Sequence, residues 1–192
     1  MRGLIRRHGP CALTPHGRSP YEALTRAIAH QQLNGRAAET ILARFCALFD
    51  GARFPSPAAV RAARAATLQR AGFSRAKVRA IKDIARHALA GAVPTRRTCA
   101  GLSDDDLVER LTQIHGVGRW TVEMLLIFTL GRTDVLPVDD FGVREGFRVA
   151  YGRRTQPTPK VLRVYGERWK PYRSVAAWYL WRAANEARRK AE

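Results

Sequence analysis

The sequence predicts an all-α fold. Apolar residues recur at spacings of three and four along most of the 192-residue chain, which is the period of one buried helix face. Serine caps and Ser-Pro pairs precede several of these stretches, and glycines follow several of them, as at helix starts and stops. The only candidate for extended backbone is residues 134–138, "DVLPV", and Pro137 argues against a central strand there.

Four helices are expected in the first half of the chain. The first starts with Ser19 as the N-cap, Pro20 in the first turn and Glu22 in position to complete a capping box. In the fourth, Val78, Ile81, Ala85 and Leu89 form one apolar stripe. Glycines 51 and 91 are expected to end the second and fourth helices. The four predicted ranges are 19–33, 35–51, 56–71 and 74–91.

The second half continues the helical pattern. Ser103 is expected to cap a helix whose first turn carries three aspartates, which suit the positive end of the helix dipole. An apolar helix should follow from Trp120 to about Leu130, and another after the paired aspartates 139 and 140. The last helix is expected from about Ser174 to Lys190. The length of the chain allows one core or two small lobes that share a cleft.

The net charge is far from neutral. Lys and Arg number 34 against 16 Asp and Glu, which gives +18 and a pI near 11.3. Such an excess indicates a polyanionic partner, with nucleic acid first; the alternative is an Arg-rich composition bias without function. The basic residues are spread along the whole chain, which favours a folded basic surface over a disordered arm.

Several classes of protein are excluded. Cys11, Cys46 and Cys99 are widely spaced and form no CxxC, against a disulfide framework, a zinc site or an iron–sulfur cluster. The N-terminus has charge but no apolar core, so it is not a secretory signal. No apolar run reaches ~18 residues, the length a membrane span needs. We therefore expect a reduced cytoplasmic compartment (nucleoid-associated in a bacterium) and no membrane partner.

A Gly-x-Gly turn joins two of the predicted helices in "IHGVGRW", residues 114–120. Glycine permits positive φ and close approach of the backbone to a ligand. The free N–H groups of the helix that follows suit a phosphate. Taken alone, the turn is equally typical of a plain corner between two helices.

These motifs carry a family resemblance. "LTQIHGVGRWTVEML" followed by "VLPVDDF" resembles the helix-hairpin-helix DNA glycosylases with a Gly/Pro-rich loop and an Asp, and is most similar to the AlkA-type 3-methyladenine DNA glycosylases. The stretches "AIAHQQLNGRAAETILARF", "AGFSRAKVRAIKDIA" and "YGERWKPYRSVAAWYLW" extend it over about residues 20–185. The resemblance implies two helical lobes flanking a DNA-binding cleft, in one glycosylase unit over residues 1–192. We expect the compact, yeast-type form without an N-terminal β-rich domain, acting as a monomer.

By this resemblance, the hairpin motif covers about residues 103–130 and binds DNA. Backbone N–H groups of Gly116, Val117 and Gly118 would meet a phosphate, with Arg119 adjoining. The carbonyls of Thr112, Ile114 and Gly116 would hold a monovalent cation, Na⁺ or K⁺, and no cofactor would be required. Arg75 and Lys77 resemble further phosphate contacts, and so do Lys170 and Arg173, although Arg173 has the alternative of bracing the fold through a buried ion pair.

The resemblance makes Asp140 the catalytic carboxylate. Asp139 is then the residue expected to cap or brace the next helix, and an ordinary N-cap is the alternative for either. Breaking an N-glycosidic bond builds positive charge on the deoxyribose, which a fixed anion in a partly dry cleft stabilises. The same carboxylate can orient or deprotonate water. Glycosylases with lyase activity place a Schiff-base Lys where this chain has Trp120, and no Lys lies between Lys82 and Lys160, which predicts a monofunctional hydrolase.

The target nucleotide must leave the duplex. By the resemblance, Trp120 and Trp181 line the pocket for the flipped base, where aromatic rings suit a cationic purine; a core position is the alternative for each. Met124 stands where an AlkA-type pocket has Tyr, which leaves the substrate range open. Trp178 and Tyr179 are expected to pack in the core. His30 and His115 receive no catalytic role.

A wedge segment, about residues 30–36, would fill the gap in the duplex, with Gln32, Leu33 and Asn34 as the candidates. A simple helix-breaking turn is the alternative. The expected substrate is double-stranded DNA with alkylated purines of the 3-methyladenine and 7-methylguanine type, leaving an abasic site in base excision repair. Two other functions stay open: a glycosylase of the same fold for another damaged base, and a non-catalytic helix-hairpin-helix module that binds DNA.

Overall fold

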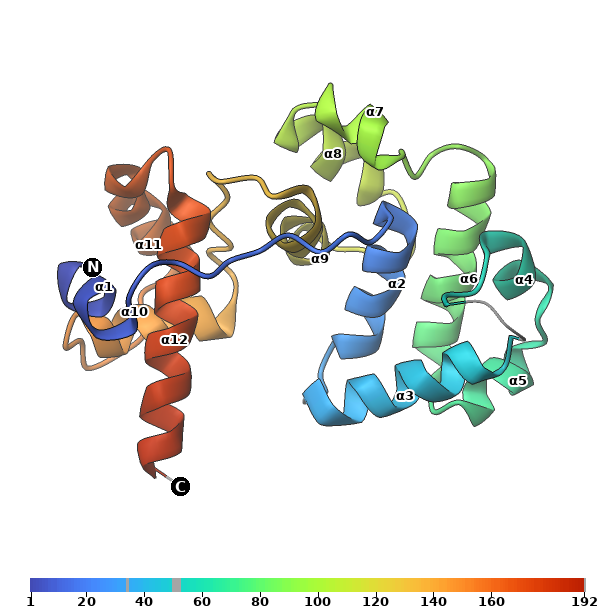
Figure 1. Ribbon diagram of the computed structural model, residues 1–192, viewed down its shortest axis with the longest axis horizontal. Helices are drawn as coiled ribbons and strands as arrows, with labels where there is room; N and C mark the ends of the chain where they lie inside the picture. Colours follow the sequence, from blue (N-terminus) through green and yellow to red (C-terminus); the bar gives the residue numbers. More distant parts are fainter. Residues whose placement is uncertain (34, 50–52, 192) are drawn as a thin grey trace. The chain divides into compact units, whose positions relative to one another are not determined.

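The prediction of an all-α fold is confirmed. The structure, a computed structural model, describes residues 1–33, 35–49 and 53–191, and within these ranges every regular element is a helix (Figure 1). Residues 134–138 form no strand. No helix in the same ranges has the length and apolar character needed to cross a bilayer.

The chain divides into two compact units. The hairpin unit is His16–Leu125, and the aspartate unit comprises Met1–Pro15 and Leu126–Glu192. The hairpin unit holds α2 (Pro20–His30), α3 (Gly35–Ala47), α4 (Pro57–Ala62), α5 (Ala65–Arg70), α6 (Arg75–Leu89), α7 (Arg96–Ala100), α8 (Asp104–Leu111) and α9 (Arg119–Leu125). The aspartate unit holds α1 (Arg2–His8), the π-helix η1 (Leu126–Leu130), α10 (Phe141–Ala150), α11 (Pro159–Gly166), the 3₁₀-helix η2 (Glu167–Trp169) and α12 (Arg173–Ala191).

Serine caps start the helices where the sequence predicts them, but the capping box expected at Ser19 is formed at Ser103 instead, and the carboxylate of Glu22 binds Arg26. The side chains of Ser19, Ser56, Ser74 and Ser103 each accept the backbone N–H of the residue three positions later. At Ser103 the exchange is reciprocal, because Asp106 accepts the N–H of Ser103 and completes a capping box. A cap of this kind stabilises a helix by about 1 kcal/mol.

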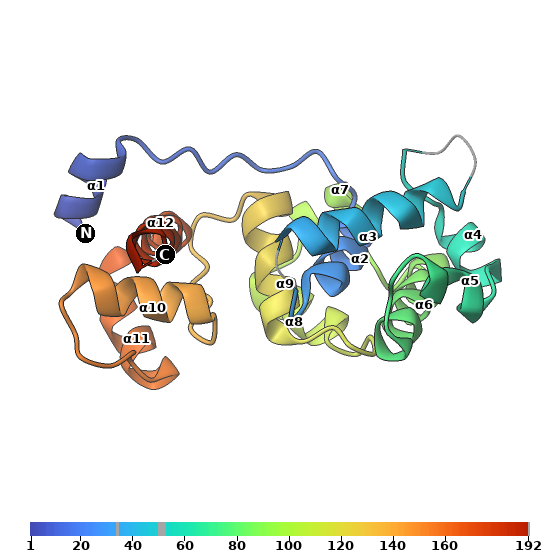
Figure 2. The ribbon, with the colours of Figure 1, turned by 90° about the horizontal axis from the view of Figure 1, so that it is seen from below.

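The core of the hairpin unit lies around α2. This helix packs against α3, α6 and α9, and α6 also packs against α4 and α5 (Figures 1 and 2). Leu24 and Ile28 of α2 and Ile81 and Ile84 of α6 are fully buried at helical spacing. Each such side chain stabilises the fold by about 1.5–3 kcal/mol relative to an exposed one. Phe45 of α3 adds edge-to-face contacts with three further phenylalanines.

Several helix boundaries differ from the predicted ones. The first helix, expected over 19–33, ends at His30. The helix expected over 56–71 is interrupted, because Ala63 and Arg64 adopt extended ψ values of 140°. The Lys82 ammonium accounts for this break by binding the Ala63 carbonyl at 2.7 Å, a contact that no local pattern contains. The second helix ends at Ala47, and its expected stop at Gly51 falls outside the described residues. The apolar helix from Trp120 changes to π-helix at Leu126.

Other differences concern burial and short helices. Leu89, expected on a buried stripe, is 48% exposed at the end of α6. Helices α1, α7 and α11 were not predicted. The start of α11 did have a signal in the sequence, because Thr158 and Pro159 form the same cap-and-proline pair that starts α2.

The aspartate unit is organised around α10 and α12. A Cβ on Gly146 would lie 1.9 Å from the carbonyl oxygen of Leu180, so this glycine allows the two helix backbones to touch. Val143, Phe147 and Leu180 fill the core beside this crossing. Helix α1 packs against α12, and the Tyr179 hydroxyl binds the carbonyl of Gly9 at 2.8 Å (Figure 1).

An ion pair fixes the loop before α10 to the start of α12. The Arg173 guanidinium binds both carboxylate oxygens of Asp134, at 2.7 and 3.0 Å. The hydroxyl of Ser174 reinforces the junction by donating to the Arg132 carbonyl and accepting the N–H of Val135. The structure therefore contains the bracing ion pair of Arg173, although the pair is partly exposed rather than buried.

Candidate functional site

The hairpin turn depends on one glycine in a left-handed conformation. Gly116 has φ +81°, and a Cβ there would lie 2.7 Å from the Cβ of Ala80 on α6. Both the backbone angle and the close approach therefore require glycine. The carbonyl of Gly118 accepts the N–H groups of Thr121 and Val122, so α9 starts from the second glycine of the turn.

The three N–H groups expected to meet a phosphate differ in their surroundings. The N–H of Val117 donates to the Ile114 carbonyl within the turn, at 3.0 Å. For the N–H groups of Gly116 and Gly118, no acceptor occurs within residues 1–33, 35–49 and 53–191. The two glycines are thus the better placed donors for an external anion.

Asp83 of α6 binds the backbone of the hairpin at His115. Its carboxylate accepts the backbone N–H of His115 at 2.8 Å and binds Arg86 on its own helix. Burial by itself would raise the pKa of Asp83. The hydrogen bonds from His115 and Arg86 and the nearby His87 outweigh burial, so the pKa of this carboxyl lies below its usual value. The side chain of His115 takes no part in this bond.

Two of the carbonyls predicted to hold a cation are hydrogen-bond acceptors in the structure. Ile114 accepts from Val117, and Gly116 accepts from the side-chain Nε2 of Gln31 at 3.2 Å. A carbonyl oxygen has two lone pairs, so these bonds leave capacity for an ion. Thr112 directs its hydroxyl back to the Val108 carbonyl. The part of the chain that the structure describes contains no group of three His, Cys, Asp or Glu side chains that suits a metal ion.

The basic residues near the hairpin have unequal surroundings. Arg75 is exposed in the first turn of α6. Arg119 pairs with the buried Glu123 one turn later, at 3.2 Å. Lys77 is half-buried, which lowers its pKa, and its ammonium binds the carbonyls of Ala29 and Gln31, both at 2.8 Å. Lys77 therefore supports the end of α2, and its contact with a phosphate stays a prediction.

The predicted wedge segment follows α2. Gln31 caps the helix, Gln32 has φ +55°, a value rare for a residue other than glycine, and Leu33 is 40% exposed. An exposed leucine at the tip of a tight turn suits insertion into a base stack. Asn34, the third candidate, lies outside the described residues.

Trp120 and Met124 lie one turn apart on α9, and both are half-buried. Their spacing of four puts them on the same face of the helix. The apolar residues beside them on α9, Val122 and Leu125, are buried, so this face is open to a ligand, as a base pocket requires.

Asp140 is the N-cap of α10, and this corrects the prediction that gave the cap to Asp139. The Oδ1 atom of Asp140 accepts the N–H of Val143 at 2.8 Å. Asp139 is exposed in the preceding turn. The chain reverses at Pro137–Asp140, where the Asp140 N–H bonds to the Pro137 carbonyl, so the second aspartate reaches the first turn of the helix.

The same oxygen of Asp140 has a second donor. The indole Nε1 of Trp181, on α12, binds Oδ1 at 2.8 Å. Gly142 leaves room for this contact, because a Cβ there would lie 2.8 Å from the indole ring and 3.2 Å from Oδ1. A cap bond and an indole bond together fix the plane of the carboxylate. Sequence reasoning placed Trp181 in a base pocket and missed its bond to the carboxylate.

Two aromatic residues near this carboxylate were not predicted. The ring of Phe128 lies 5.4 Å from that of Trp181, centroid to centroid. Phe128 follows the pocket candidate Met124 by four residues, which is the spacing of one helix face, so the sequence did contain a reason to include it. Phe141, directly after Asp140, is 71% exposed. Trp178 and Tyr179 are buried, which confirms their expected packing in the core.

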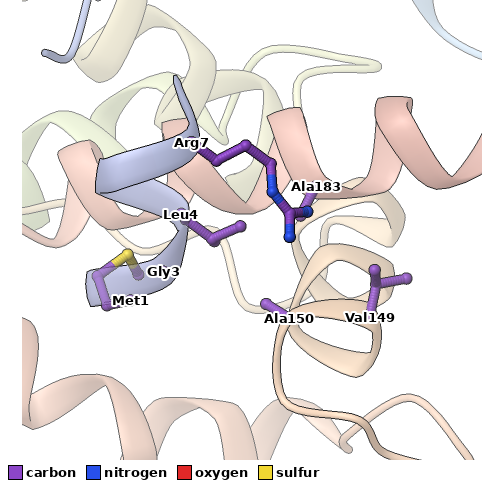
Figure 3. Close-up of a pocket in the computed structure, with 7 residues that line it drawn as sticks. All are labelled: Met1, Gly3, Leu4, Arg7, Val149, Ala150 and Ala183. Carbon is purple, nitrogen blue, oxygen red and sulfur yellow. The ribbon is translucent and has the colours of Figure 1, made fainter. Parts of the chain in front are cut away.

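A cavity of about 150 Å³ lies in the aspartate unit between α1, α10 and α12. Figure 3 shows Leu4 and Arg7 of α1 on one side and Val149 and Ala183 on the other. None of the predicted site residues lines it, and its walls offer neither a carboxylate nor an aromatic ring. This cavity is therefore separate from the candidate site at Asp140.

Comparison with known proteins agrees with these features. A family model described as HhH-GPD superfamily base excision DNA repair protein matches residues 25–171. The DNA-3-methyladenine glycosylase 1 of Schizosaccharomyces pombe is 42% identical over 170 residues, covering 88% of this chain and 75% of the relative.

Solved structures give the same result. The S. pombe 3-methyladenine DNA glycosylase in complex with abasic DNA superposes with a TM-score of 0.89 at 40% identity, over 94% of this chain and 88% of that one. A DNA-3-methyladenine glycosidase from Bacillus halodurans superposes with a TM-score of 0.85 at 33% identity, over 98% and 86% of the two chains. This protein therefore belongs to the HhH-GPD superfamily of base excision DNA repair proteins.

Proposed function

We propose that this protein is a monofunctional DNA glycosylase that hydrolyses the N-glycosidic bond of alkylated purines in double-stranded DNA and leaves an abasic site. The geometry of Asp140 is the observation that carries the proposal. A carboxylate is fixed at a helix start by a backbone N–H and an indole N–H, inside the segment that matches a base excision repair family. The names of the relatives, 3-methyladenine glycosylases, support the choice of alkylated purines.

The chemistry assigned to Asp140 is electrostatic first. As the bond between base and sugar breaks, the deoxyribose acquires positive charge, which a carboxylate of fixed orientation stabilises without reorganisation. The same group can orient or accept a proton from the attacking water. An alkylated purine leaves as a cation, so the site needs little acid assistance.

Substrate binding is assigned to three further features. The N–H groups of Gly116 and Gly118 would bind a DNA phosphate, aided by Arg75 and Arg119 and by the net charge of +18. A Na⁺ or K⁺ ion at the Thr112, Ile114 and Gly116 carbonyls would strengthen this contact. Leu33 or Gln32 would fill the space of the flipped nucleotide. The family resemblance assigns contacts with the base to Trp120 and Met124 of the hairpin unit and to Trp181 of the aspartate unit. We propose that the protein acts as a monomer.

Release of bases from methylated duplex DNA tests the proposal. The wild-type protein should release methylated purines, and Asp140→Asn should reduce the single-turnover rate by about 10²–10³-fold, the size typical of a lost electrostatic group. Asparagine caps helices as well as aspartate does, so the fold should persist. Asp139→Asn is the matched control, because it removes the neighbouring exposed carboxylate, and it should keep the wild-type rate.

Two results would contradict the proposal. If the wild-type protein binds DNA tightly but releases no base, the chain is a binding module. If Asp139→Asn is inactive and Asp140→Asn is active, the first aspartate holds the catalytic position. A panel of duplexes with single defined lesions, including deaminated and oxidised bases, then defines the substrate range that Met124 leaves open.

A further inference from the structure

The turn after α2 and the hairpin turn are joined by one side chain. The carboxamide of Gln31 donates from Nε2 to the carbonyl of Gly116, at 3.2 Å, and to the hydroxyl of Thr121, at 3.3 Å. Gln31 is separated from these residues by 85 and 90 positions in the chain. One donor group therefore contacts both the hairpin glycine and the first turn of α9.

The backbone of Gln31 is held from the other side. The Lys77 ammonium binds the carbonyls of Ala29 and Gln31, which are at the carbonyl end of α2, where a cation is favourable. The backbone N–H of Gln31 remains bonded to the last turn of α2. With backbone and side chain both fixed, Gln31 sets the direction in which the chain leaves the helix.

The residues that follow have little support of their own. Gln32 adopts a φ of +55°, and the N–H of Leu33 donates to the His30 carbonyl, the one backbone bond that this residue makes within residues 1–33, 35–49 and 53–191. Both side chains are exposed. A non-glycine residue with positive φ persists only where its surroundings impose it, and among the described residues the anchors of Gln31 are contacts of this kind.

The hairpin turn rests on the same helix as Lys77. Gly116 lies against Ala80, and the N–H of His115 binds Asp83, so α6 contacts the hairpin one and two turns after it contacts the end of α2. Helix α6 thus fixes each turn separately. Gln31 bonds directly to both, through its backbone at the end of α2 and its side chain at the hairpin.

We infer that Gln31 is a positioning residue: its carboxamide fixes the 31–33 turn relative to the hairpin, so that a phosphate bound at Gly116–Gly118 sets where Gln32 and Leu33 meet the base stack. This inference deepens the proposed function and rests on its assignment of the hairpin and the 31–33 turn to DNA. The link contributes to affinity only when both contacts are made together, as on DNA with a base missing from the stack. Binding to intact duplex, which needs no insertion, does not depend on it.

Comparing the affinity of each variant for two DNA duplexes distinguishes a positioning role of Gln31 from a purely structural one. One duplex carries a stable abasic-site analogue and the other is intact, and the measured quantity is the ratio of the two dissociation constants. Gln31→Met keeps the length of the side chain but removes both donated bonds. The preference for the abasic duplex should fall about 3- to 10-fold, as expected for one or two neutral hydrogen bonds, with intact-duplex affinity within about twofold of wild type.

Two further variants complete the test. Thr121→Val removes one of the two bonds with no change of shape and should give a smaller loss of preference. Gln69→Ala removes an exposed glutamine on α5 of the same unit and should leave the ratio unchanged. If Gln31→Met does not fold, the Thr121→Val ratio decides alone, and a wild-type ratio there overturns the inference.

Other outcomes also overturn it. A Gln31→Met protein with lower thermal stability and an unchanged ratio would have lost only a structural bond, and an equal loss of affinity for both duplexes would mean a general defect in DNA binding. Base release from methylated DNA by wild type is measured in parallel. If wild type releases no base, the proposed glycosylase function fails, whereas the affinity ratio still tests the link.

Discussion

The indole nitrogen of Trp181 and the backbone nitrogen of Val143 donate to the same carboxylate oxygen of Asp140, each at 2.8 Å. One bond comes from α10 itself and the other from α12, so the carboxylate is held between two packed helices. The aspartate is both a helix cap and the candidate catalytic group. A cap fixes an oxygen close to the helix axis, and the tertiary bond then fixes the plane of the group.

Trp181→Phe tests the indole bond while keeping an aromatic ring beside Phe128. Without the N–H donor the carboxylate can rotate, and we expect the single-turnover rate of base release to fall about 10- to 100-fold, the equivalent of about 1.5–3 kcal/mol for a hydrogen bond to a charged group. Binding to intact duplex should change little. Trp178→Phe, a tryptophan of the same helix that packs in the core, is the control and should keep the rate per folded molecule. Full activity of Trp181→Phe would remove the positioning role.

Gly146→Ala tests the closeness of α10 and α12. Alanine is favoured over glycine within a helix by about 1 kcal/mol. Here its Cβ would lie 1.9 Å from a backbone carbonyl oxygen, which cannot move aside as a flexible side chain can. We expect a net loss of at least about 3 kcal/mol and a fall in Tm of about 6 °C or more, measured by thermal unfolding. Gly3→Ala, where nothing lies within 4 Å of the new Cβ, should be neutral or slightly stabilising.

Asp83→Asn tests the support of the hairpin through its pH dependence. The pKa of Asp83 in the folded protein lies below its value in the unfolded chain, about 3.9. The charged form therefore stabilises the fold fully above that value, and this contribution is lost as the pH falls through the folded-state pKa. We expect Asp83→Asn to destabilise the protein by about 1 kcal/mol at pH 7 and the difference from wild type to shrink below about pH 4.

Denaturant unfolding from pH 2 to 7 provides this measurement. Asp105→Asn is the matched control, because that carboxylate is 94% exposed in the first turn of α8 and makes only a weak contribution there, so it should destabilise the protein less than Asp83→Asn does at pH 7. A constant difference between Asp83→Asn and wild type across the range would show that the charge on Asp83 is not what supports His115.

Borohydride trapping tests the absence of lyase chemistry. A Schiff base needs a lysine at the sugar, and the chain has Trp at position 120 and no Lys between Lys82 and Lys160. Incubation with methylated DNA and borohydride should give no covalent protein–DNA adduct, whereas a lyase-type glycosylase trapped in parallel should give one. A robust adduct would identify a lysine nucleophile and end the monofunctional assignment.

The sequence by itself determined the helical fold, the positions of the serine caps, the hairpin and the family. These features depend on local rules, because a capping serine, an apolar stripe or a Gly-x-Gly turn is recognised within a few residues. The choice of Asp140 over Asp139 as the catalytic candidate also came from the spacing within a family motif and stays a prediction, whereas the helix cap was assigned to the wrong neighbour.

Only the tertiary structure decided which residues hold these features in place. The bond of Gln31 to Gly116, that of Asp83 to His115 and that of Trp181 to Asp140 join positions 85, 32 and 41 residues apart. The break at Ala63 and the contact of Gly146 with Leu180 depend on neighbouring helices in the same way. Such contacts follow from how helices pack, and no periodicity within one helix contains the partner that another helix supplies.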